Sequence, residues 1–314
     1  MSDDLPVTLD DVARAAATIR GHVRRTPLLD AHEVGAGVRI KAELFQHAGS
    51  FKARGVVNRL TALDEAERER GVITVSAGNH AGALAWGAAR EGIDCVVVIY
   101  AGASPYKVER TRAYGATIEL VDGDPVDAFE RMEEIVAETG RVVIHPFDDP
   151  VVMAGQGTVG AEILEEAADT DVIVVPVGGG GLVAGIAAAV TPRGVRVVGV
   201  EPEGSAALRL ALEAGEPVCV RPETIAGGLD APYAGTNALV VCQACSVESV
   251  LVTDAEIEAA TRRLYADVKL ACEPAGAAGL AAVLAGRVEG ERIAVVVSGG
   301  NVGPETASAI LAGR

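Results

Sequence analysis

Lys52 is the residue of this chain whose surroundings most clearly indicate chemistry. It stands in Gly49-Ser50-Phe51-Lys52-Ala53-Arg54-Gly55-Val56, among small and apolar neighbours, at the expected start of a helix. A lysine that is removed from water near the positive end of a helix has a lowered pKa. Its neutral amine could form an imine with a carbonyl group and could remove a proton from carbon. A helical lysine is usually a solvated surface charge, so the interpretation depends on these neighbours.

Four consecutive glycines, Gly178, Gly179, Gly180 and Gly181, follow a run of apolar residues and precede a helical pattern. Backbone N–H groups at such a helix start form an anion site that a phosphate group can occupy. The pattern is neither GxGxxG nor a P-loop, which disfavours a nucleotide-dependent oxidoreductase. A tight turn alone needs fewer glycines, so we interpret the segment as a phosphate-binding loop.

A second polar loop, Ser76-Ala77-Gly78-Asn79-His80, joins an expected strand to an expected helix. Its backbone amides and polar side chains could bind a carboxylate. The alternative is an N-capping turn, which serine and asparagine commonly make. Ser298 ends a further expected strand and is a weak signal by itself.

The elements between these segments must hold them in place. Apolar runs alternate with helical patterns along most of the chain, which predicts an α/β protein with mainly parallel sheets flanked by helices. The segment 145–150 is dense in turn-forming residues and is interpreted as a break. Strands are expected at 39–43, 72–76, 95–100, 117–121, 141–144, 171–176, 195–200 and 293–298, and helices at 12–19, 52–63, 80–90, 105–114, 125–139, 155–168, 182–189, 205–214, 254–268 and 274–284.

The composition agrees with this fold class. The 314 residues are 49% hydrophobic but only 3% aromatic, as expected for a core of Ala, Val, Leu and Ile. The formal charge of −17 argues against binding to nucleic acid or to an anionic membrane surface. Residues 172–190 carry no charge, but Pro176 and the four glycines favour a buried strand, turn and helix over a membrane span.

The five cysteines are scattered, and the chain starts without a basic region or an apolar segment. Both features favour a cytoplasmic protein without a signal peptide. Cys242 and Cys245 form a lone CxxC, and no further zinc ligands stand nearby at matching spacing. We expect both thiols to be small buried hydrophobic groups.

With these segments in place, the chain resembles the fold-type II pyridoxal-phosphate enzymes, and within them the threonine/serine dehydratase (ammonia-lyase) and serine racemase group. The resemblance covers about residues 8–305 and rests on the order and spacing of the motifs together. In chain order these are RTPL at 25–28, ELFQ at 43–46, SFKARG at 50–55, SAGNH at 76–80, YGA at 114–116, HPFD at 145–148, GQGT at 155–158, PVGGGGL at 176–182, EPAG at 273–276 and SGGN at 298–301.

The resemblance implies a pyridoxal 5'-phosphate cofactor. Lys52 would bind the cofactor aldehyde and would remove the α-proton of the substrate. Phe51 and Gly228 would flank the ring of the cofactor. Asn79 would contact the ring hydroxyl group, and Ser298 would hydrogen-bond the pyridine nitrogen. With the glycine loop on the phosphate, the implied cofactor contacts are Phe51, Lys52, Asn79, Gly178, Gly179, Gly180, Gly181, Gly228 and Ser298.

The implied activity is that of an L-threonine/L-serine ammonia-lyase, which eliminates water and releases a 2-oxo acid and ammonia. Ser76, Asn79 and His80 would receive the carboxylate of this small-molecule amino-acid substrate. The family also implies a large cofactor-binding domain (1–66 and 149–314), a small domain (71–146) that carries the Asn/His loop, and a homodimer.

Some positions of the chain differ from the family pattern, and each difference changes what the resemblance implies about activity or ligands. Ala77 stands where relatives that racemise well have a serine, so weak racemisation is expected. Gly82 stands where dehydratases often have glutamine, so the motifs do not fix the substrate. Glu201 matches a cation ligand of some relatives, but Ala207 replaces the accompanying aspartate. Glu201 is therefore only a weak candidate for a metal ligand. A monovalent cation at this residue stays open as an alternative to a divalent metal.

Other functions stay open at this point. The substrate could be another β-hydroxy amino acid, such as 3-hydroxyaspartate or a phenylserine. The chemistry could be racemisation, or β-replacement as in cysteine synthases, although His80 stands where those relatives usually have threonine. A protein that binds the cofactor or an amino acid without turnover is a further alternative, which the complete set of motifs disfavours.

Overall fold

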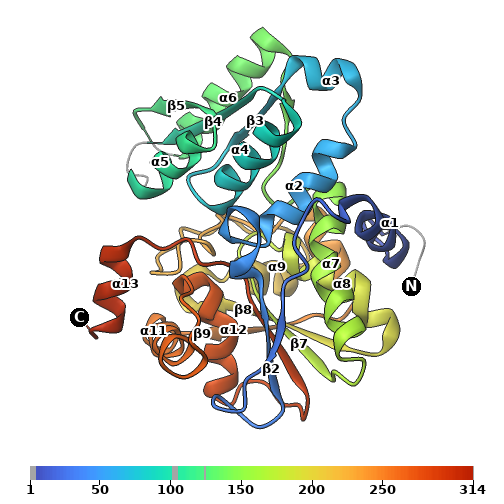
Figure 1. Cartoon of the computed structure of the whole chain (residues 1–314), viewed down its shortest axis with the longest axis vertical. Coiled ribbons are helices and arrows are strands. Elements are labelled where there is room, and N and C mark those ends of the chain that lie inside the picture. The colour runs from blue at the N-terminus through green and yellow to red at the C-terminus, as the bar shows by residue number, and fades with distance from the viewer. Residues whose placement is uncertain (1–4, 101–104, 124, 314) are drawn as a thin grey trace.

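A computed structural model describes residues 5–100, 105–123 and 125–313. Its strands form two separate sheets, which lie in the lower and upper halves of Figure 1. The strands are β1 (Leu28–Asp30), β2 (Val38–Ala42), β3 (Val72–Val75), β4 (Cys95–Tyr100), β5 (Thr117–Val121), β6 (Val142–Val143), β7 (Val172–Pro176), β8 (Arg196–Pro202), β9 (Glu248–Val252) and β10 (Ile293–Val297).

Helices cover the faces of both sheets, as expected for this alternating sequence. No helix within the described ranges has both the length and the apolar character that a bilayer crossing requires. The helices are α1 (Leu9–Ile19), α2 (Lys52–Thr61), α3 (Glu65–Arg70), α4 (Asn79–Glu91), α5 (Pro105–Ala113), α6 (Pro125–Thr139), α7 (Pro150–Glu166), α8 (Gly181–Val190), α9 (Ala207–Ala214), α10 (Thr236–Ala244), α11 (Asp254–Arg263), α12 (Pro274–Leu284) and α13 (Pro304–Leu311).

The large sheet has the order β1-β2-β10-β7-β8-β9, and every pairing in it except the antiparallel β1–β2 pair is parallel. The small sheet has the order β5-β4-β3-β6 and is parallel throughout. The strands β7 and β10 are buried along their whole length, which explains their continuous runs of β-branched residues. The predicted fold class of mainly parallel α/β sheets is therefore confirmed.

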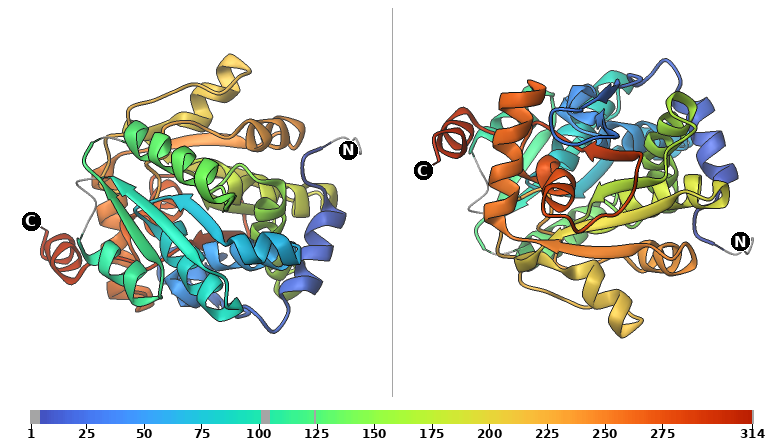
Figure 2. Two further views of the ribbon diagram at one scale, coloured as in Figure 1. Left: turned by 90° about the horizontal axis from the view of Figure 1, so that it is seen from above. Right: turned by 90° about the horizontal axis from the view of Figure 1, so that it is seen from below.

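The strands of the small sheet come from one continuous part of the chain, between β3 and β6, whereas those of the large sheet come from either side of it. We propose that this division corresponds to the small domain at 71–146 and the large domain at 1–66 and 149–314. In Figure 2, α6 (green) lies across one face of the small sheet while α4 lies on the other, and separate apolar clusters fill these two faces. The helix α2 packs against both α7 and α4 and so connects the two halves.

Several elements differ from the sequence-based expectation. The helix expected at 155–168 begins at Pro150, because Asp149 Oδ1 accepts hydrogen bonds from the N–H groups of Val151 and Val152 and proline suits the first helical position. The turn-forming residues thus mark a helix start as well as a break. The helix expected at 254–268 changes at Leu264 into a π-helix that ends at Lys269. The edge strand β9 and the helix α10 were not predicted.

A cluster of buried charges fixes the position of α2. Arg54 on α2 is 0% exposed, and its Nε and Nη2 atoms donate to the two carboxylate oxygens of Glu43 at 2.8 Å each. Its Nη1 and Nη2 atoms also donate to Glu162 on α7, at 2.7 and 2.8 Å. Lys41 on β2 is equally buried and pairs with Glu162 at 2.7 Å. Burial opposes the charge of Arg54, but Glu43 and Glu162 outweigh it and raise the pKa of the guanidinium.

We predict that Arg54→Met strongly destabilises the fold. The substitution leaves the carboxylate of Glu43, which is 0% exposed, without its counter-ion. Breaking such a buried pair costs about 3–5 kcal/mol of unfolding free energy, measured by urea denaturation. The matched control is Arg14→Met, which removes an ion pair whose arginine side chain is 70% exposed and should cost less than about 1 kcal/mol. Equal losses for the two variants would contradict the prediction.

Candidate functional site

Two segments far apart in the sequence pair at the C-terminal end of β10. The N–H of Phe51 donates to the carbonyl oxygen of Ser298 at 3.0 Å, and Ser50 and Gly299 form an antiparallel bridge. Gly49, at φ 76°, makes the turn before this pairing, a backbone conformation that suits glycine. The pairing places the first residue of α2, Lys52, beside Ser298, so two predicted site residues that are distant in sequence become neighbours.

The amine of Lys52 is held by the backbone of the loop that precedes α7. Lys52 Nζ donates to the carbonyl oxygen of Pro146 at 2.6 Å and lies 5.1 Å from the centroid of the Phe51 ring. Removal from water disfavours the ammonium form and lowers the pKa of Lys52 to about 8. The lowered pKa expected from the sequence is therefore present, and a substantial fraction of the amine is neutral near pH 8.

The segment 145–149, which the sequence suggested only as a break, connects the parts of the site. Pro146 receives Lys52, as described above, while the ring of Phe147 packs on the glycine loop and makes edge contacts with His145 and Tyr233. The carboxylate of Asp148 accepts hydrogen bonds from N–H groups at the start of α10. This connecting role has no signal in the sequence beyond the motif HPFD, because it depends on contacts with distant segments.

Gly178 to Gly181 follow β7 and lead into α8, as expected for an anion-binding loop. Close packing also requires them. A Cβ on Gly179 would stand 2.3 Å from the Phe147 ring, and one on Gly181 would stand 2.5 Å from the Phe147 carbonyl oxygen. Gly180 has a φ of 91°. The inference that four glycines exceed the needs of packing is therefore wrong. The first N–H groups of α8 have no acceptor within the helix, which keeps the loop suited to a phosphate.

The loop 76–80 leads into α4, which begins at Asn79. Its polar side chains make hydrogen bonds within the protein. Ser76 Oγ accepts a hydrogen bond from the N–H of Gly78 at 3.2 Å. The His80 ring is 2% exposed, and its Nε2 atom lies 3.0 Å from the carbonyl oxygen of Ile144, to which it donates. Burial, with the nearby charge of Lys52, lowers the pKa of His80 to about 3, so the imidazole is neutral. The N–H groups at the start of α4 are left as the donors best placed for a carboxylate.

Asn79 is the polar centre of the site. Its Nδ2 atom donates to Glu273 Oε1 at 2.5 Å, and its Oδ1 atom accepts from Asn301 Nδ2 at 2.7 Å. A Cβ on Gly228 would stand 3.7 Å from Asn79 Nδ2, so this glycine faces the same place. The roles of Glu273 and Asn301 were not recognised from the sequence. A charged residue directly before a long apolar helix was the available signal for Glu273, which is 3% exposed.

Glu201 has a structural task in this fold. It is 0% exposed, and its carboxylate accepts hydrogen bonds from the N–H groups of Leu208 and Arg209, in the first turn of α9, and from Ser249 Oγ. A negative charge at a helix N-terminus is stabilising. Among the described residues, no group of three or more His, Cys, Asp or Glu side chains could hold a metal ion. The weak prediction of a cation on Glu201 thus gains no further ligands.

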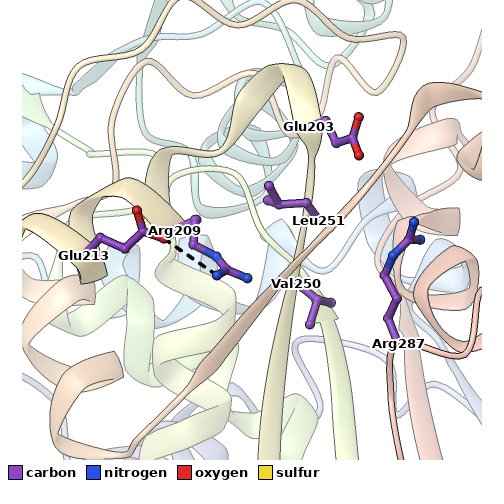
Figure 3. Close-up of a pocket in the computed structure, with 6 residues that line it drawn as sticks. All are labelled: Glu203, Arg209, Glu213, Val250, Leu251 and Arg287. Carbon is purple, nitrogen blue, oxygen red and sulfur yellow. Dashed lines mark ion pairs between the residues drawn. The ribbon is translucent and has the colours of Figure 1, made fainter.

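Two other features lie apart from this site. Cys242 and Cys245 are buried on α10, and burial raises the pKa of both thiols. A surface groove of about 420 Å³ runs along the edge strand β9, where Arg209 pairs with Glu213 (Figure 3). None of the residues that line this groove is among the predicted site residues: they are Glu203, Arg209, Glu213, Val250, Leu251 and Arg287.

We predict that Gly179→Ala destabilises the protein through the Phe147 ring. Overpacking of this kind costs about 1–3 kcal/mol of unfolding free energy, measured by urea denaturation. In the double variant Gly179→Ala/Phe147→Ala the added methyl group has room, so the loss should be smaller than the sum of the two single losses. Gly82→Ala is the matched control, because its Cβ would meet only Tyr114, at 3.8 Å. Strict additivity of the two losses would show that the contact with Phe147 does not matter.

The residues present fit pyridoxal phosphate. The site offers an amine of lowered pKa and helix-start N–H groups for a phosphate, and the backbone of Ser298 pairs with Phe51, the residue before Lys52. The Oγ atom of Ser50 is buried and has no hydrogen-bond partner within the described chain, as expected for a polar group that awaits a ligand.

Comparison with known proteins agrees with this chemistry. Residues 19–299 match the family described as pyridoxal-phosphate dependent enzyme. The chain is 39% identical to a phenylserine dehydratase of Ralstonia pickettii over 309 residues, which cover 95% of this chain and 94% of that protein. It is 38% identical to an L-threonine ammonia-lyase of Thermotoga maritima over 305 residues, 94% of this chain and 76% of that protein. The structure of maize serine racemase matches with a TM-score of 0.92 and 34% identity, covering 98% of each chain.

A family match over most of the chain, and relatives of this similarity over nearly its whole length, leave no doubt about its class. The chain belongs to the fold-type II pyridoxal-phosphate-dependent enzymes of the threonine/serine dehydratase group, and it is a lyase that uses this cofactor.

Proposed function

We propose that the enzyme is an L-threonine/L-serine ammonia-lyase, which removes water from its substrate and releases a 2-oxo acid and ammonia. The observation that carries the proposal is the amine of Lys52, with a pKa lowered to about 8, at the junction of the glycine loop and Ser298. An amine of this kind can take up and return a proton near neutral pH. The elimination requires such a group, because the α-proton of the amino acid must be removed before the β-hydroxyl group leaves.

The chemistry divides between the cofactor and the residues of this chain. Pyridoxal phosphate, when bound, supplies an acceptor for the electron pair that remains once the α-proton is removed. Lys52 Nζ would hold the cofactor and take this proton. The N–H groups at the start of α4, at Asn79 and His80, would bind the substrate carboxylate. Ser298 would place a neutral hydroxyl group, rather than a carboxylate, at the pyridine nitrogen.

The neutral ring of His80 changes its proposed part in substrate binding. Since its Nε2 atom is engaged by Ile144, the contribution of His80 to the carboxylate would come from its backbone N–H. Ser76 would orient the loop through the N–H of Gly78. The carboxylate is then recognised by a helix start and not by a positive side chain.

A second substrate class is supported by the open space beside α4. A Cβ on Gly82 would meet only Tyr114, at 3.8 Å, and one on Gly78 would meet no atom within 4 Å. Both positions therefore leave room for a substrate side chain larger than that of threonine. The phenylserine dehydratase is as similar to this chain as the L-threonine ammonia-lyase, so an aromatic β-hydroxy amino acid is the second candidate. A substrate of the 3-hydroxyaspartate type is a further one.

Racemisation and β-replacement are secondary proposals. Ala77 offers no proton on the face opposite Lys52, so we propose that D-serine forms from L-serine more slowly than pyruvate does. Addition of a thiol nucleophile would reveal a β-replacement activity if a new amino acid forms in place of the 2-oxo acid.

We also propose that the enzyme is cytoplasmic and that it forms a homodimer. Light scattering during gel filtration would test the homodimer.

Substrate preference is the first test of the proposed function. The purified protein with pyridoxal phosphate should release a 2-oxo acid from L-threonine or L-serine, with phenylserine and 3-hydroxyaspartate as comparisons in a coupled ketoacid assay. Lys52→Ala should lower this rate by at least about 1,000-fold, since it removes the group that moves the proton. Arg112→Ala, a change at an exposed cation on α5, is the control. A Lys52→Ala variant that still releases ketoacid at a comparable rate would remove Lys52 from its proposed role.

The pH dependence of cofactor capture tests the Lys52 pKa. Only the neutral amine attacks an aldehyde, and at pKa 8 about one tenth of the amine is neutral at pH 7. The rate at which the apoprotein captures pyridoxal phosphate should therefore rise with pH and level off above about pH 9. Stopped-flow absorbance measures this rate, and 4-deoxypyridoxine 5'-phosphate, which lacks the aldehyde, is the control. A rate that still rises steeply at pH 9.5 would indicate a lysine with an ordinary pKa.

A further inference from the structure

A chain of four polar side chains runs between the small-sheet and large-sheet halves beside the cofactor site. Arg110 Nη1, on α5, donates to Asn301 Oδ1 at 2.6 Å. Asn301 Nδ2 donates to Asn79 Oδ1 at 2.7 Å, and Asn79 Nδ2 donates to Glu273 Oε1 at 2.5 Å. Arg110 and Asn79 come from the small-sheet half, and Asn301 and Glu273 from the other. Each bond of this polar chain therefore crosses between the halves.

The two ends of the polar chain differ in chemistry. A guanidinium group can only donate hydrogen bonds, and an ionised carboxylate can only accept them. The two amides between them can point in either direction when considered alone. Arg110 must face an oxygen, and the carbonyl oxygen of Ala48, 2.8 Å from Asn301 Nδ2, can only accept. Both contacts orient the amide of Asn301 so that its NH2 group also faces Asn79. Asn79 must then turn its own NH2 group to Glu273.

We propose that Arg110 and Glu273 are positioning residues that together set the direction of this polar chain, so that Asn79 presents its NH2 group to the cofactor site. The inference rests on the proposed function in one respect, namely that Asn79 contacts the ring hydroxyl group. One hydrogen of Asn79 Nδ2 is used by Glu273, and the second can be donated to a ring oxygen. A donor at this position stabilises the anionic form of that oxygen, whereas a carbonyl oxygen there would repel it.

The surroundings act on the charge state of both ends of the polar chain. Arg110 is held between two tyrosines, whose hydroxyl groups both lie 3.4 Å from its guanidinium nitrogens. Burial, together with the negative charge of Asp230, raises the pKa of Glu273, and the charge of Lys107, the hydrogen bond from Asn79 and the charge of Arg110 offset only part of this shift. Arg110 therefore acts at both ends, because it orients Asn301 directly and its charge favours the ionised, acceptor-only form of Glu273.

Position 82, a glycine, lies near one of the tyrosines that hold Arg110. A Cβ at Gly82 would already lie 3.8 Å from the Tyr114 ring, and Tyr114 is one of the two tyrosines that hold Arg110. A longer side chain at position 82 would extend toward the same tyrosine. The glycine at position 82 therefore leaves Tyr114, and the arginine that it contacts, undisturbed.

The test compares variants that change the donor or acceptor character of the two ends. Arg110→Lys keeps a group that only donates, Arg110→Gln can donate or accept, and Arg110→Glu makes both ends acceptors. Glu273→Gln changes the opposite end and serves as an independent variant. The control is Arg112→Gln on the same helix, where the arginine pairs with Glu109 at the surface.

Two measurements need no turnover. The first is the apparent Kd of the apoprotein for pyridoxal phosphate together with the absorption maximum of the bound cofactor. The second is side-chain amide NMR of the apoprotein labelled with 15N-asparagine, which is tractable because the sequence contains only four asparagines. In the wild-type protein the Asn79 and Asn301 amide protons should exchange slowly with solvent.

We expect Arg110→Gln and Glu273→Gln to weaken cofactor binding about tenfold, to shift the absorption maximum and to speed the exchange of the Asn79 amide. Arg110→Glu should have a larger effect, while Arg110→Lys and Arg112→Gln should stay close to wild type. The proposal is overturned if Arg110→Gln matches wild type, or if Arg110→Lys loses as much as Arg110→Gln. If the wild-type enzyme releases no 2-oxo acid, the proposed function fails, while the binding and exchange series still decides this inference.

Discussion

Arg54 and Lys41 bring two positive charges into the interior of the protein, and the position of Lys52 depends on how these charges are balanced. An unpaired buried charge would be too costly to keep, so β2, α2 and α7 must bring Glu43 and Glu162 within hydrogen-bond distance of them. These contacts fix the first turn of α2, whose first residue is Lys52. The amine of Lys52 thus takes its place from a network of ion pairs in the interior of the protein.

The same first turn is held from a second direction by the pairing of Ser50 with Gly299. The large sheet ends there, at the carboxyl end of β10, and the glycine loop lies at the corresponding end of β7, its neighbour in the sheet. Ligands of parallel α/β sheets commonly bind at this edge. The parallel order of the strands therefore brings Ser298 and the glycine loop together, while α2 adds the amine of Lys52 and α4 begins within the loop 76–80.

Polar groups at this site serve two purposes, and the structure separates them. His80, Ser76 and Asp148 are engaged mainly with the backbone and shape the loops that carry them. We propose that Lys52, Ser298 and Asn79 are instead the groups that contact the cofactor. This separation explains how a family with one fold can act on several β-hydroxy amino acids, because the loop-shaping contacts can stay while open positions such as Gly82 change.

The sequence by itself determined the fold class, the family and the cofactor. Alternating strands and helices have periods that can be recognised locally, and the lysine, glycine and Asn/His motifs occur in a fixed order. Only the tertiary structure shows which of these residues are already packed or hydrogen-bonded within the protein. It showed that packing against Phe147 also requires the glycines, that Nε2 of His80 is bonded to the carbonyl oxygen of Ile144, and that Asn79 is oriented by Glu273 and Asn301. These contacts join residues as many as 222 positions apart, and no local pattern in the chain records such a pairing.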